Sequence, residues 1–366
     1  MNPIRSSHPA SGVRGLLLGA ALLAGFSGRI GPPLRAQTPR EPAASAVGRT
    51  AAPGRWTVVT PEGALAWFDL MADLRLPGAG AFPLVEVRSR AIPAAERDLA
   101  NALAGTRESE ILHFVPLYHP SADRAALAAA LRGAANTPAR SPTPRAELLV
   151  GALARSLQAD TRRARLPEVA AALERRPPVV SPAAARIALL QRELDSLYLP
   201  SLAPWLALER LDAGRLIVAP GVGTEGRIFA GTQDRTDNLV AVGNFAADAD
   251  ERAPLLAFVR ELCFPAITRA TQGVTGFDGA NADGARRASL AAVRCGAALL
   301  DARLPVRSDA YRAFWLRRAA ATSGAPAATG QRDRASRRAD FDRAFPADPA
   351  LAGAVDRAIG RVPRDR

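Results

Sequence analysis

The spacing of apolar residues along the first half of the chain predicts helices with a few short strands. Residues 55–59 and the apolar runs 82–88 and 111–118 are expected to be strands. Thr60 as N-cap and Pro61 at the first helical position are expected to begin a helix that continues to about residue 74. Further helices are expected over 121–134, 145–158, 166–175 and from 181 to a stop at Pro200.

After residue 214 the pattern changes to strands and then to helices. Apolar runs bounded by Gly-rich and Asp-rich turns favour strands at 215–219, 227–230 and 238–242. Helical spacing follows at 252–267 with a break or kink at Pro265, at 284–303, at 309–321 and in two short basic segments at the C-terminus. The predicted fold class is therefore α+β, predominantly helical with a small sheet.

Segments of simple composition flank this pattern, which favours one domain. Residues 37–54 are rich in Pro and Ala and are expected to be a linker. Residues 55–322 are expected to form a single mainly helical domain. Residues 323–366 are expected to form a basic low-complexity linker followed by short C-terminal helices.

Residues 1–36 have the pattern of an export signal. Arg5 and Arg14 precede an apolar stretch over 15–27, and the small residue Ala36 ends an acceptable cleavage site. The stretch is shorter than the roughly 20 residues of a membrane-spanning helix, although retention as an N-terminal anchor is an alternative. We expect a secreted or periplasmic protein that is cleaved after Ala36.

Composition narrows the class of protein. The chain has 366 residues, of which 48% are hydrophobic but only 5% aromatic, so its core is built mostly from Ala, Leu and Val. This favours close-packed helices over a sandwich of aromatic and β-branched residues. No apolar run reaches the length that a helix needs to cross a bilayer, which excludes a multi-span membrane protein.

The basic residues are unusual in their type and in their distribution along the chain. All 48 basic residues are Arg, and the formal net charge is +13. Residues 303–366 hold 14 Arg against seven Asp. No groove-reading motif accompanies them, so we expect no nucleic-acid partner. The C-terminal tail is expected to be either a solvated appendage or a contact to an anionic surface, such as a membrane face or an acidic envelope polymer.

The two cysteines, Cys263 and Cys295, both lie in strongly helical segments. An oxidising compartment would permit a disulfide between them, closing a loop of about 32 residues and stabilising the fold by about 3 kcal/mol. The alternative is a pair of buried thiols that act as small hydrophobic residues. We predict the disulfide.

The segment 221–226 matches the pattern GxGxxG after an expected strand. In a dinucleotide site these glycines open a helix whose N-terminus holds the pyrophosphate. Here strand-like residues follow, so we interpret the segment as a Gly-rich turn. No cofactor is expected.

Histidine is scarce, which limits hydrolytic chemistry. After removal of the signal only His113 and His119 remain, and no serine lies in a G-x-S-x-G elbow. Six residues apart on a strand, the two would share a face and could hold a metal together with a distant third ligand. We favour a structural role for both.

The segment 255–264 is an apolar helix with one acid, Glu261, placed directly after the last expected strand. In its order of strand, hairpin, edge strand, acid-bearing helix and second helix, the region 215–302 resembles HExxH zinc metallopeptidases of the gluzincin kind. In those proteins two His at i and i+4 bind zinc and the intervening Glu is the general base. The resemblance places Arg260 and Phe264 at the two His positions.

The resemblance implies a zincin-like frame without its metal. A guanidinium and a phenyl ring cannot bind zinc, and no Glu follows Glu261 to supply the third ligand from the next helix. Only Glu261 carries over, as a remnant of the base, in a cleft with Arg260, Phe264 and Arg294. Adjacent helical residues diverge by about 100°, so Arg260 and Glu261 are not expected to pair with each other. Arg294 on the neighbouring helix is a candidate partner for Glu261 if the two helices are antiparallel. The alternative is an ordinary core helix.

These observations favour an exported, non-catalytic pseudo-enzyme that binds a peptide or an envelope protein. Two alternatives stay open. One is a structural or interaction module without enzymatic ancestry, and the other is a metal-independent hydrolase that uses His113 or His119.

Overall fold

A computed structural model describes residues 55–360 with gaps. The gaps are at 77, 79, 89–90, 104–106, 119–122, 137–152, 154–156, 158–160, 231–237, 247, 249, 273, 275–276, 278–281 and 325–332. The expected signal and linker over 1–54, all but two residues of the helix expected over 145–158, and His119 lie outside the described residues.

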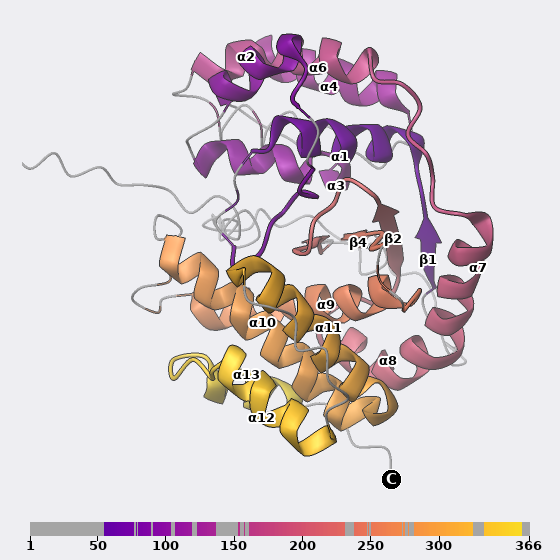
Figure 1. Cartoon of the computed structure of the whole chain (residues 1–366), viewed down its shortest axis with the longest axis vertical. Coiled ribbons are helices and arrows are strands. Elements are labelled where there is room, and N and C mark those ends of the chain that lie inside the picture. Colours follow the sequence, from indigo (N-terminus) through magenta and orange to yellow (C-terminus); the bar gives the residue numbers. More distant parts are fainter. Residues whose placement is uncertain are drawn as a thin grey trace, which may run out of the picture.

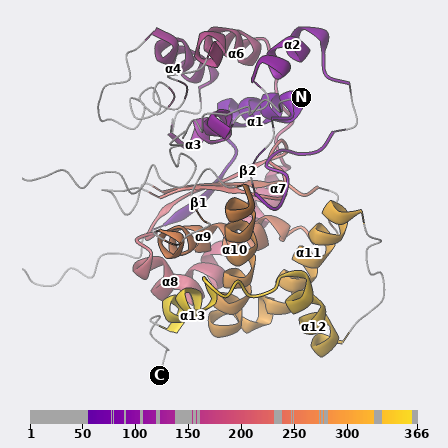
Figure 2. The ribbon, with the colours of Figure 1, turned by 90° about the vertical axis from the view of Figure 1, so that its left-hand side faces the viewer.

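A four-stranded sheet lies between two layers of helices (Figures 1 and 2). Its strands run in the order β1-β2-β4-β3, with β1, β2 and β4 parallel and β3 antiparallel to β4 at one edge. Their bounds are β1 Trp56–Val59, β2 Gly214–Ala219, β3 Arg227–Phe229 and β4 Asn238–Gly243. The three strands expected after residue 214 are therefore confirmed.

The central strands β2 and β4 are apolar on both faces, as in a sheet covered by helices on both sides. Along β2, Leu216 and Val218 belong to one buried hydrophobic cluster, whereas Ile217 and Ala219 belong to a second cluster across the sheet. Side chains alternate between the faces of a strand, so each layer has its own core.

The upper layer in Figure 1 is built from the N-terminal helices. They are α1 Glu62–Leu74, α2 Ala94–Leu103, the 3₁₀ helix η2 Arg107–Phe114, α3 Val115–Tyr118, α4 Arg124–Asn136, the 3₁₀ helix η3 Thr161–Arg165 and α6 Leu166–Glu174.

The lower layer contains most of the helices that follow in the sequence, with α7 at its border with the sheet (Figures 1 and 2). They are α7 Ala184–Glu193, the π-helical turn η4 Leu194–Tyr198, α8 Leu199–Leu208, α9 Ala253–Thr271, α10 Ala282–Arg303, α11 Pro305–Ser323, α12 Arg334–Ala344 and α13 Ala352–Gly360.

Two of the expected strands are wrong. Residues 111–118 are helical, in η2 and α3, and their Pro116 has no N–H to give to a sheet ladder. Residues 82–88 contribute a single isolated bridge, between Val85 and Val222, and no strand. Short apolar runs do not distinguish a strand from a buried helical turn or an extended loop.

Three helix signals also act differently than expected. Pro61, without a side-chain hydrogen bond, caps α1 in place of Thr60. Pro200 does not end the helix, because the π turn η4 connects α7 to α8 and Pro200 falls in the first turn of α8. Pro265 does not break α9, which continues to Thr271, and the alternative of a kink at Pro265 stays a prediction.

The C-terminal helices belong to the lower core. Phe341 and Phe345 at α12 and Leu351 and Val355 at α13 are buried in the same cluster as α9 and α10. The fold is mostly helical with one small mixed sheet, which agrees with the predicted α+β class. Among the described helices, none is both long and apolar enough to span a membrane.

Candidate functional site

Arg260 and Glu261 lie in the middle of α9, a helix that is buried along almost its whole length. Their side chains are 0% and 1% exposed. Charged groups at this depth are tolerated only when they are paired, so their partners define the site.

The guanidinium of Arg260 joins two helices and the turn before β3. Its Nη1 is paired with Glu261 Oε1, and its Nη2 donates to Glu225 Oε1 at 2.9 Å and to Ser289 Oγ at 2.8 Å. Ser289, on α10, donates in turn to Glu225 Oε2 at 3.0 Å. We refer to Arg260, Glu261, Glu225 and Ser289 as the central cluster.

Aromatic rings line the same guanidinium. The carbon at the centre of the Arg260 guanidinium lies 4.9 Å from the ring centre of Phe264 and 5.9 Å from that of Trp315. Such contacts stabilise a desolvated cation. The residues at the two expected ligand positions, Arg260 and Phe264, therefore contact each other.

Burial and pairing act on the charges of the cluster in opposite directions. Burial alone would lower the pKa of Arg260, but the carboxylates of Glu225 and Glu261 outweigh it, so the pKa lies above its ordinary value. Burial raises the pKa of Glu261 above its ordinary value, although Arg260 opposes that shift. The guanidinium is thus the fixed charge of the cluster.

A second buried cation, Arg227 on β3, lies beside the central cluster and is 1% exposed. Burial lowers its pKa to about 9, and the nearby Glu261 and Glu225 partly offset this effect. Its guanidinium also lies 5.1 Å from the ring centre of Phe68. Two arginines and two glutamates therefore balance in charge.

The Gly-rich segment 221–226 brings Glu225 to the cluster. The N–H of Gly226 donates to Glu261 Oε1 at 3.1 Å. A Cβ at Gly226 would lie 2.8 Å from both Ala241 O and Glu261 Cγ, so the close approach requires glycine. The segment leads into β3 and not into a helix, as predicted for a turn.

The donor set of this site does not fit zinc. At the two His positions that the resemblance implies stand a guanidinium and a phenyl ring, and no Glu follows Glu261 in the sequence to supply a third ligand from α10. Zinc prefers imidazole, thiolate and carboxylate ligands. Nowhere in the described part of the chain do three or more His, Cys, Asp or Glu side chains form a group that could hold a metal ion.

Two predictions about pairing are wrong. Arg294 does not contact Glu261, because it donates to Asp342 Oδ1 at 3.0 Å and to Phe345 O at 2.6 Å on α12 and the residue after it. Glu261 instead pairs with its sequence neighbour Arg260. The two side chains leave the helix in different directions, but the long arginine chain turns its guanidinium back to the carboxylate.

Sequence reasoning missed Glu225, Ser289 and Arg227 as members of the site. Glu225 and Arg260 are 35 residues apart, and Ser289 and Arg260 are 29 apart. One signal was present in the sequence, since a lone acid inside a Gly-rich turn that leads into a buried strand must find a cation.

His113 does not have the geometry expected for a pair with His119. It lies in η2 and not on a strand, is fully buried, and its Nδ1 lies 3.2 Å from Arg227 Nη2. Because a guanidinium can only donate, Nδ1 of His113 is the acceptor if this contact is a hydrogen bond. His119 lies outside the described residues.

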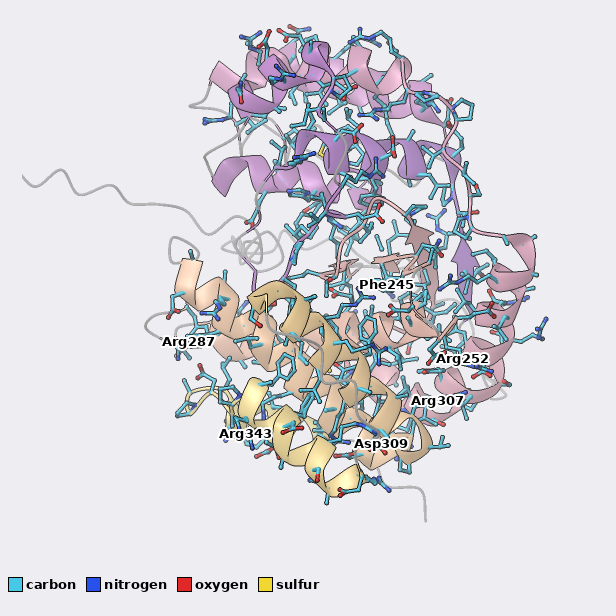
Figure 3. All side chains as sticks on the ribbon, in the orientation of Figure 1. Phe245, Arg252, Arg287, Arg307, Asp309 and Arg343 are labelled. Atoms are coloured by element: carbon cyan, nitrogen blue, oxygen red, sulfur yellow. The ribbon has the colours of Figure 1, made fainter. Side chains whose placement is uncertain are left out.

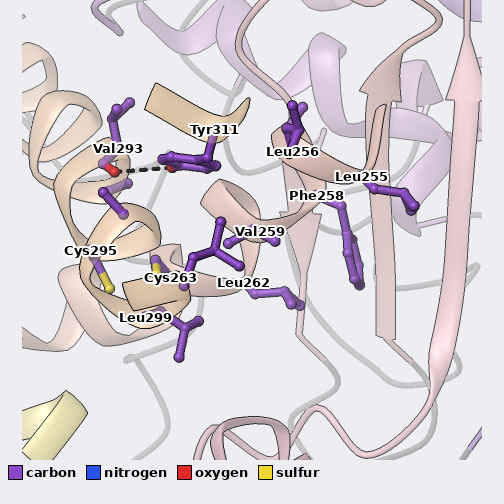
Figure 4. Close-up of a cluster of buried hydrophobic side chains, with 14 of the residues drawn as sticks. Leu255, Leu256, Phe258, Val259, Leu262, Cys263, Val293, Cys295, Leu299 and Tyr311 are labelled. Carbon is purple, nitrogen blue, oxygen red and sulfur yellow. Dashed lines mark hydrogen bonds between the residues drawn. The ribbon is translucent and has the colours of Figure 1, made fainter. Parts of the chain in front are cut away.

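Cys263 on α9 and Cys295 on α10 face each other in the lower core (Figure 4). Both are buried free thiols, and burial together with a hydrogen bond to Cys295 raises the pKa of Cys263 well above its ordinary value. The chain thus brings together the two sulfurs that were expected to pair. The disulfide itself stays a prediction for the exported protein.

Several charged residues of the C-terminal helices and the turn between them form ion pairs within the protein itself. Arg337 bonds to Asp309 and Arg343 to Asp340, each at 3.0 Å, and Arg287 of α10 bonds to Asp348 at 2.6 Å. Arg287, Asp309 and Arg343 all lie in the lower layer of helices (Figure 3). Residues 333–360 contain five Arg and five Asp. This part of the tail carries no net charge, and contact with an anionic surface stays a prediction.

Comparisons with known proteins do not name a class. No protein-family model matches the sequence, and no curated protein or solved structure is significantly similar to it. The site must therefore be interpreted from its own chemistry.

Proposed function

We propose that this chain is an exported, non-catalytic protein with a frame like that of a zinc peptidase, and that it binds a peptide or envelope protein without cleaving it. The observation that carries this proposal is the guanidinium of Arg260, which lies among Glu225, Glu261 and Ser289. In a zinc peptidase of this layout a metal ion would be held by residues of the same two helices.

The order of the elements supports the frame. β2 is followed by the antiparallel pair β3 and β4, then by α9 with Glu261 and by α10, which packs on α9. β3 lies at the edge of the sheet, close to α9. The order agrees with the one on which the resemblance rests except for the edge strand. No separate edge strand follows the hairpin among the described residues, and β4, which precedes α9, lies between β2 and β3.

Charge supports the absence of catalysis. Arg260 and Arg227 together supply two positive charges to Glu225 and Glu261, the same charge that a divalent metal ion would bring. Oε1 of Glu261, the carboxylate that would act as the base, is already engaged by Arg260 and by the N–H of Gly226. This pairing supports a role without catalysis.

A ligand-restoration experiment tests the frame. The double variant Arg260→His/Phe264→His places two imidazoles at i and i+4 on α9 beside the carboxylate of Glu225, which is the His₂Glu set of a catalytic zinc site. We expect it to bind one zinc ion per chain and to gain thermal stability when zinc is added. Elemental analysis and melting curves with and without a chelator measure both effects.

The matched control is Arg260→His/Phe264→Ala, which makes the same change of charge but lacks the second imidazole. It should bind zinc about tenfold more weakly or worse. If neither variant binds zinc while the double variant remains folded, the zincin-like frame is wrong, and the plain interaction module remains.

A further inference from the structure

Residues 80–88 connect the two layers around the β3 edge of the sheet, and we refer to them as the strap. Phe82 belongs to the lower core and Val85 to the upper core. Glu86 and Val87 face solvent, and Val87 is 82% exposed. The strap therefore has one face on the protein and one in water.

The strap lies beside the Gly-rich turn as an added strand would. Its backbone runs antiparallel to residues 221–225, with Val85 opposite Val222. Three main-chain hydrogen bonds join the two segments, Glu86 N to Gly221 O at 3.1 Å, Gly223 N to Leu84 O at 3.0 Å and Glu225 N to Pro83 O at 3.1 Å. Main-chain bonds of this kind do not depend on side-chain identity, and many extended peptides bind proteins through them.

One aromatic side chain anchors the strap. The ring centre of Phe82 lies 5.1 Å from that of Trp315 and 6.3 Å from that of Phe345. The Phe82 N–H donates to Glu225 Oε2 at 3.2 Å, inside the central cluster. Trp315 also lies against the guanidinium of Arg260. The aromatic pocket and the central cluster are thus neighbours.

We refer to the place that the strap fills, between the Gly-rich turn 221–225, Arg227 and Trp315, as the groove. The Gly-rich turn forms its floor and lets a backbone approach closely. A Cβ on Gly223 would lie 2.6 Å from Val85 O and closer still to Pro83 O, so glycine is required where the strap passes. From the side, Arg227 Nη2 donates to Leu84 O at 2.5 Å. Gly223 and the guanidinium of Arg227 both contact the main chain of the strap, so these contacts do not select a particular side chain.

The strap is also tied at its end. Arg88 bonds to Asp69 at 2.7 Å and to Asp73 at 3.1 Å, both on α1. These contacts lie outside the groove. They hold the strap near the groove and so raise its effective concentration there.

We propose that the strap occupies, from within the same chain, the groove that binds the partner, and that the partner is an extended peptide with an aromatic residue for the Phe82 pocket. This inference rests on the proposed peptide-binding function and names its ligand. The partner displaces the strap, so its apparent affinity is reduced by the small fraction of chains in which the groove is open.

The test uses a fluorescent peptide with the strap sequence, GAFPLVEVR, and the full-length chain. Wild-type protein should bind it weakly, whereas Phe82→Ala, which loses the internal anchor, should bind about tenfold more tightly or better. A control peptide with Ala in place of Phe should not bind the variant measurably better than it binds wild type. Fluorescence anisotropy measures all three.

A disulfide lock provides the matched control. Val85 and Val222 form a pair without mutual hydrogen bonds, and in such a pair the side chains lie close together. In Phe82→Ala/Val85→Cys/Val222→Cys, oxidised glutathione should close the lock and abolish tight binding, and a phosphine reductant should restore it. The single Val222→Cys change in the Phe82→Ala background should not respond.

Some outcomes overturn the inference. A folded Phe82→Ala variant that binds the peptide no better than wild type, or binds both peptides equally, shows that the strap is an ordinary structural loop. If Phe82→Ala does not fold, Arg88→Ala releases the tether without touching the groove, and it should still increase peptide binding. The zinc experiment measures metal binding by two side chains of α9 and Glu225, whereas the peptide experiment measures displacement of the strap. The strap contacts Glu225 through the Phe82 N–H, but neither readout depends on the other result, so the two proposals can fail separately.

Discussion

Two groups of arginine and acidic side chains lie on opposite sides of the sheet, and they differ in their access to water. The central cluster is completely buried in the lower layer. The second group, which we refer to as the flank cluster, joins α1 to its surroundings in the upper layer. Its members are Arg176, Arg88, Asp69, Asp73 and Glu96.

The ion pairs of the flank cluster are redundant, whereas those of the central cluster are not. Arg176 and Arg88 each bridge Asp69 and Asp73, two acids four residues apart on α1 that would otherwise repel each other. Asp69 and Arg88 are 15% and 16% exposed, so water can replace a lost partner. In the central cluster, as far as the described residues show, Arg260 is the one cation paired with both glutamates. The side chains of Arg260, Glu225 and Glu261 are at most 6% exposed, so solvent has little access to replace a lost partner.

The difference between the two clusters indicates that the flank cluster is structural and the central cluster functional. A redundant, partly solvated network is typical of a contact that fixes one helix to another. A single buried guanidinium shared by two carboxylates is costly to desolvate, and packing alone could have filled its place with apolar side chains. This is why we place the functional site at the central cluster.

The largest expected effect is that of Arg260→Met, which removes the only cation within ion-pair distance of the buried carboxylates of Glu225 and Glu261 in the described part of the chain and leaves the more distant Arg227 as their only positive neighbour there. We expect a loss of about 3–5 kcal/mol in the free energy of unfolding, as for other broken buried ion pairs. Urea denaturation measures it. A loss no larger than that of the flank variant below would remove the distinction between the clusters.

A smaller loss is expected for Arg176→Met in the flank cluster. Arg88 still pairs with Asp69 and Asp73 in this variant, and water reaches Glu96 and Asp69. The expected change is about 1.5–3 kcal/mol, the range for hydrogen bonds to charged groups. The same urea experiment provides the value, and a complete loss of folding would contradict the redundancy.

The variant Glu261→Gln tests the burial of the central cluster through the pH dependence of the free energy of unfolding. Because burial raises the pKa of Glu261 above 4.5, the folded protein binds more protons than the unfolded chain just above that pH. This carboxyl therefore makes wild type less stable as pH rises from 4.5 through the folded pKa. Relative to wild type, Glu261→Gln should gain stability over this range.

Denaturation curves at a series of pH values, for wild type and Glu261→Gln side by side, measure that gain. A stability difference that stays constant from pH 4 to 8 would mean that Glu261 titrates as it does in the unfolded chain. Its burial would then carry no electrostatic cost.

The smallest effect is expected at the surface pair of Arg132 and Glu174, whose side chains are 44% and 39% exposed. Glu174→Gln should leave the free energy of unfolding unchanged within error, because exposed ion pairs contribute little and are screened by salt. A clear loss would show that ion pairs stabilise this arginine-rich protein regardless of depth.

The sequence predicted the elements whose signals are local. The strands β2, β3 and β4 lie between Gly-rich and Asp-rich turns, and the helices α9 and α10 have long apolar patterns, so each could be located. The run 111–118 failed because its apolar residues fit either structure, and Pro116 was the clue against a strand.

The site was predictable only in part, because its contacts are tertiary. Arg260, Glu261 and Phe264 could be selected from one helix, and the structure brings them together. The partners on other elements, Glu225 and Ser289, depend on how the turn before β3 and α10 pack against α9. The spacing of residues along the sequence does not predict that packing.

The central claim is that a guanidinium, and not a metal ion, neutralises the carboxylates beneath the β3 edge. Equilibrium dialysis of the purified wild-type protein against zinc, followed by elemental analysis, tests it most directly. The account predicts far less than one zinc ion per chain, with no change in melting temperature on adding a chelator. One tightly bound zinc ion per chain that Glu225→Gln or Glu261→Gln weakens would contradict it.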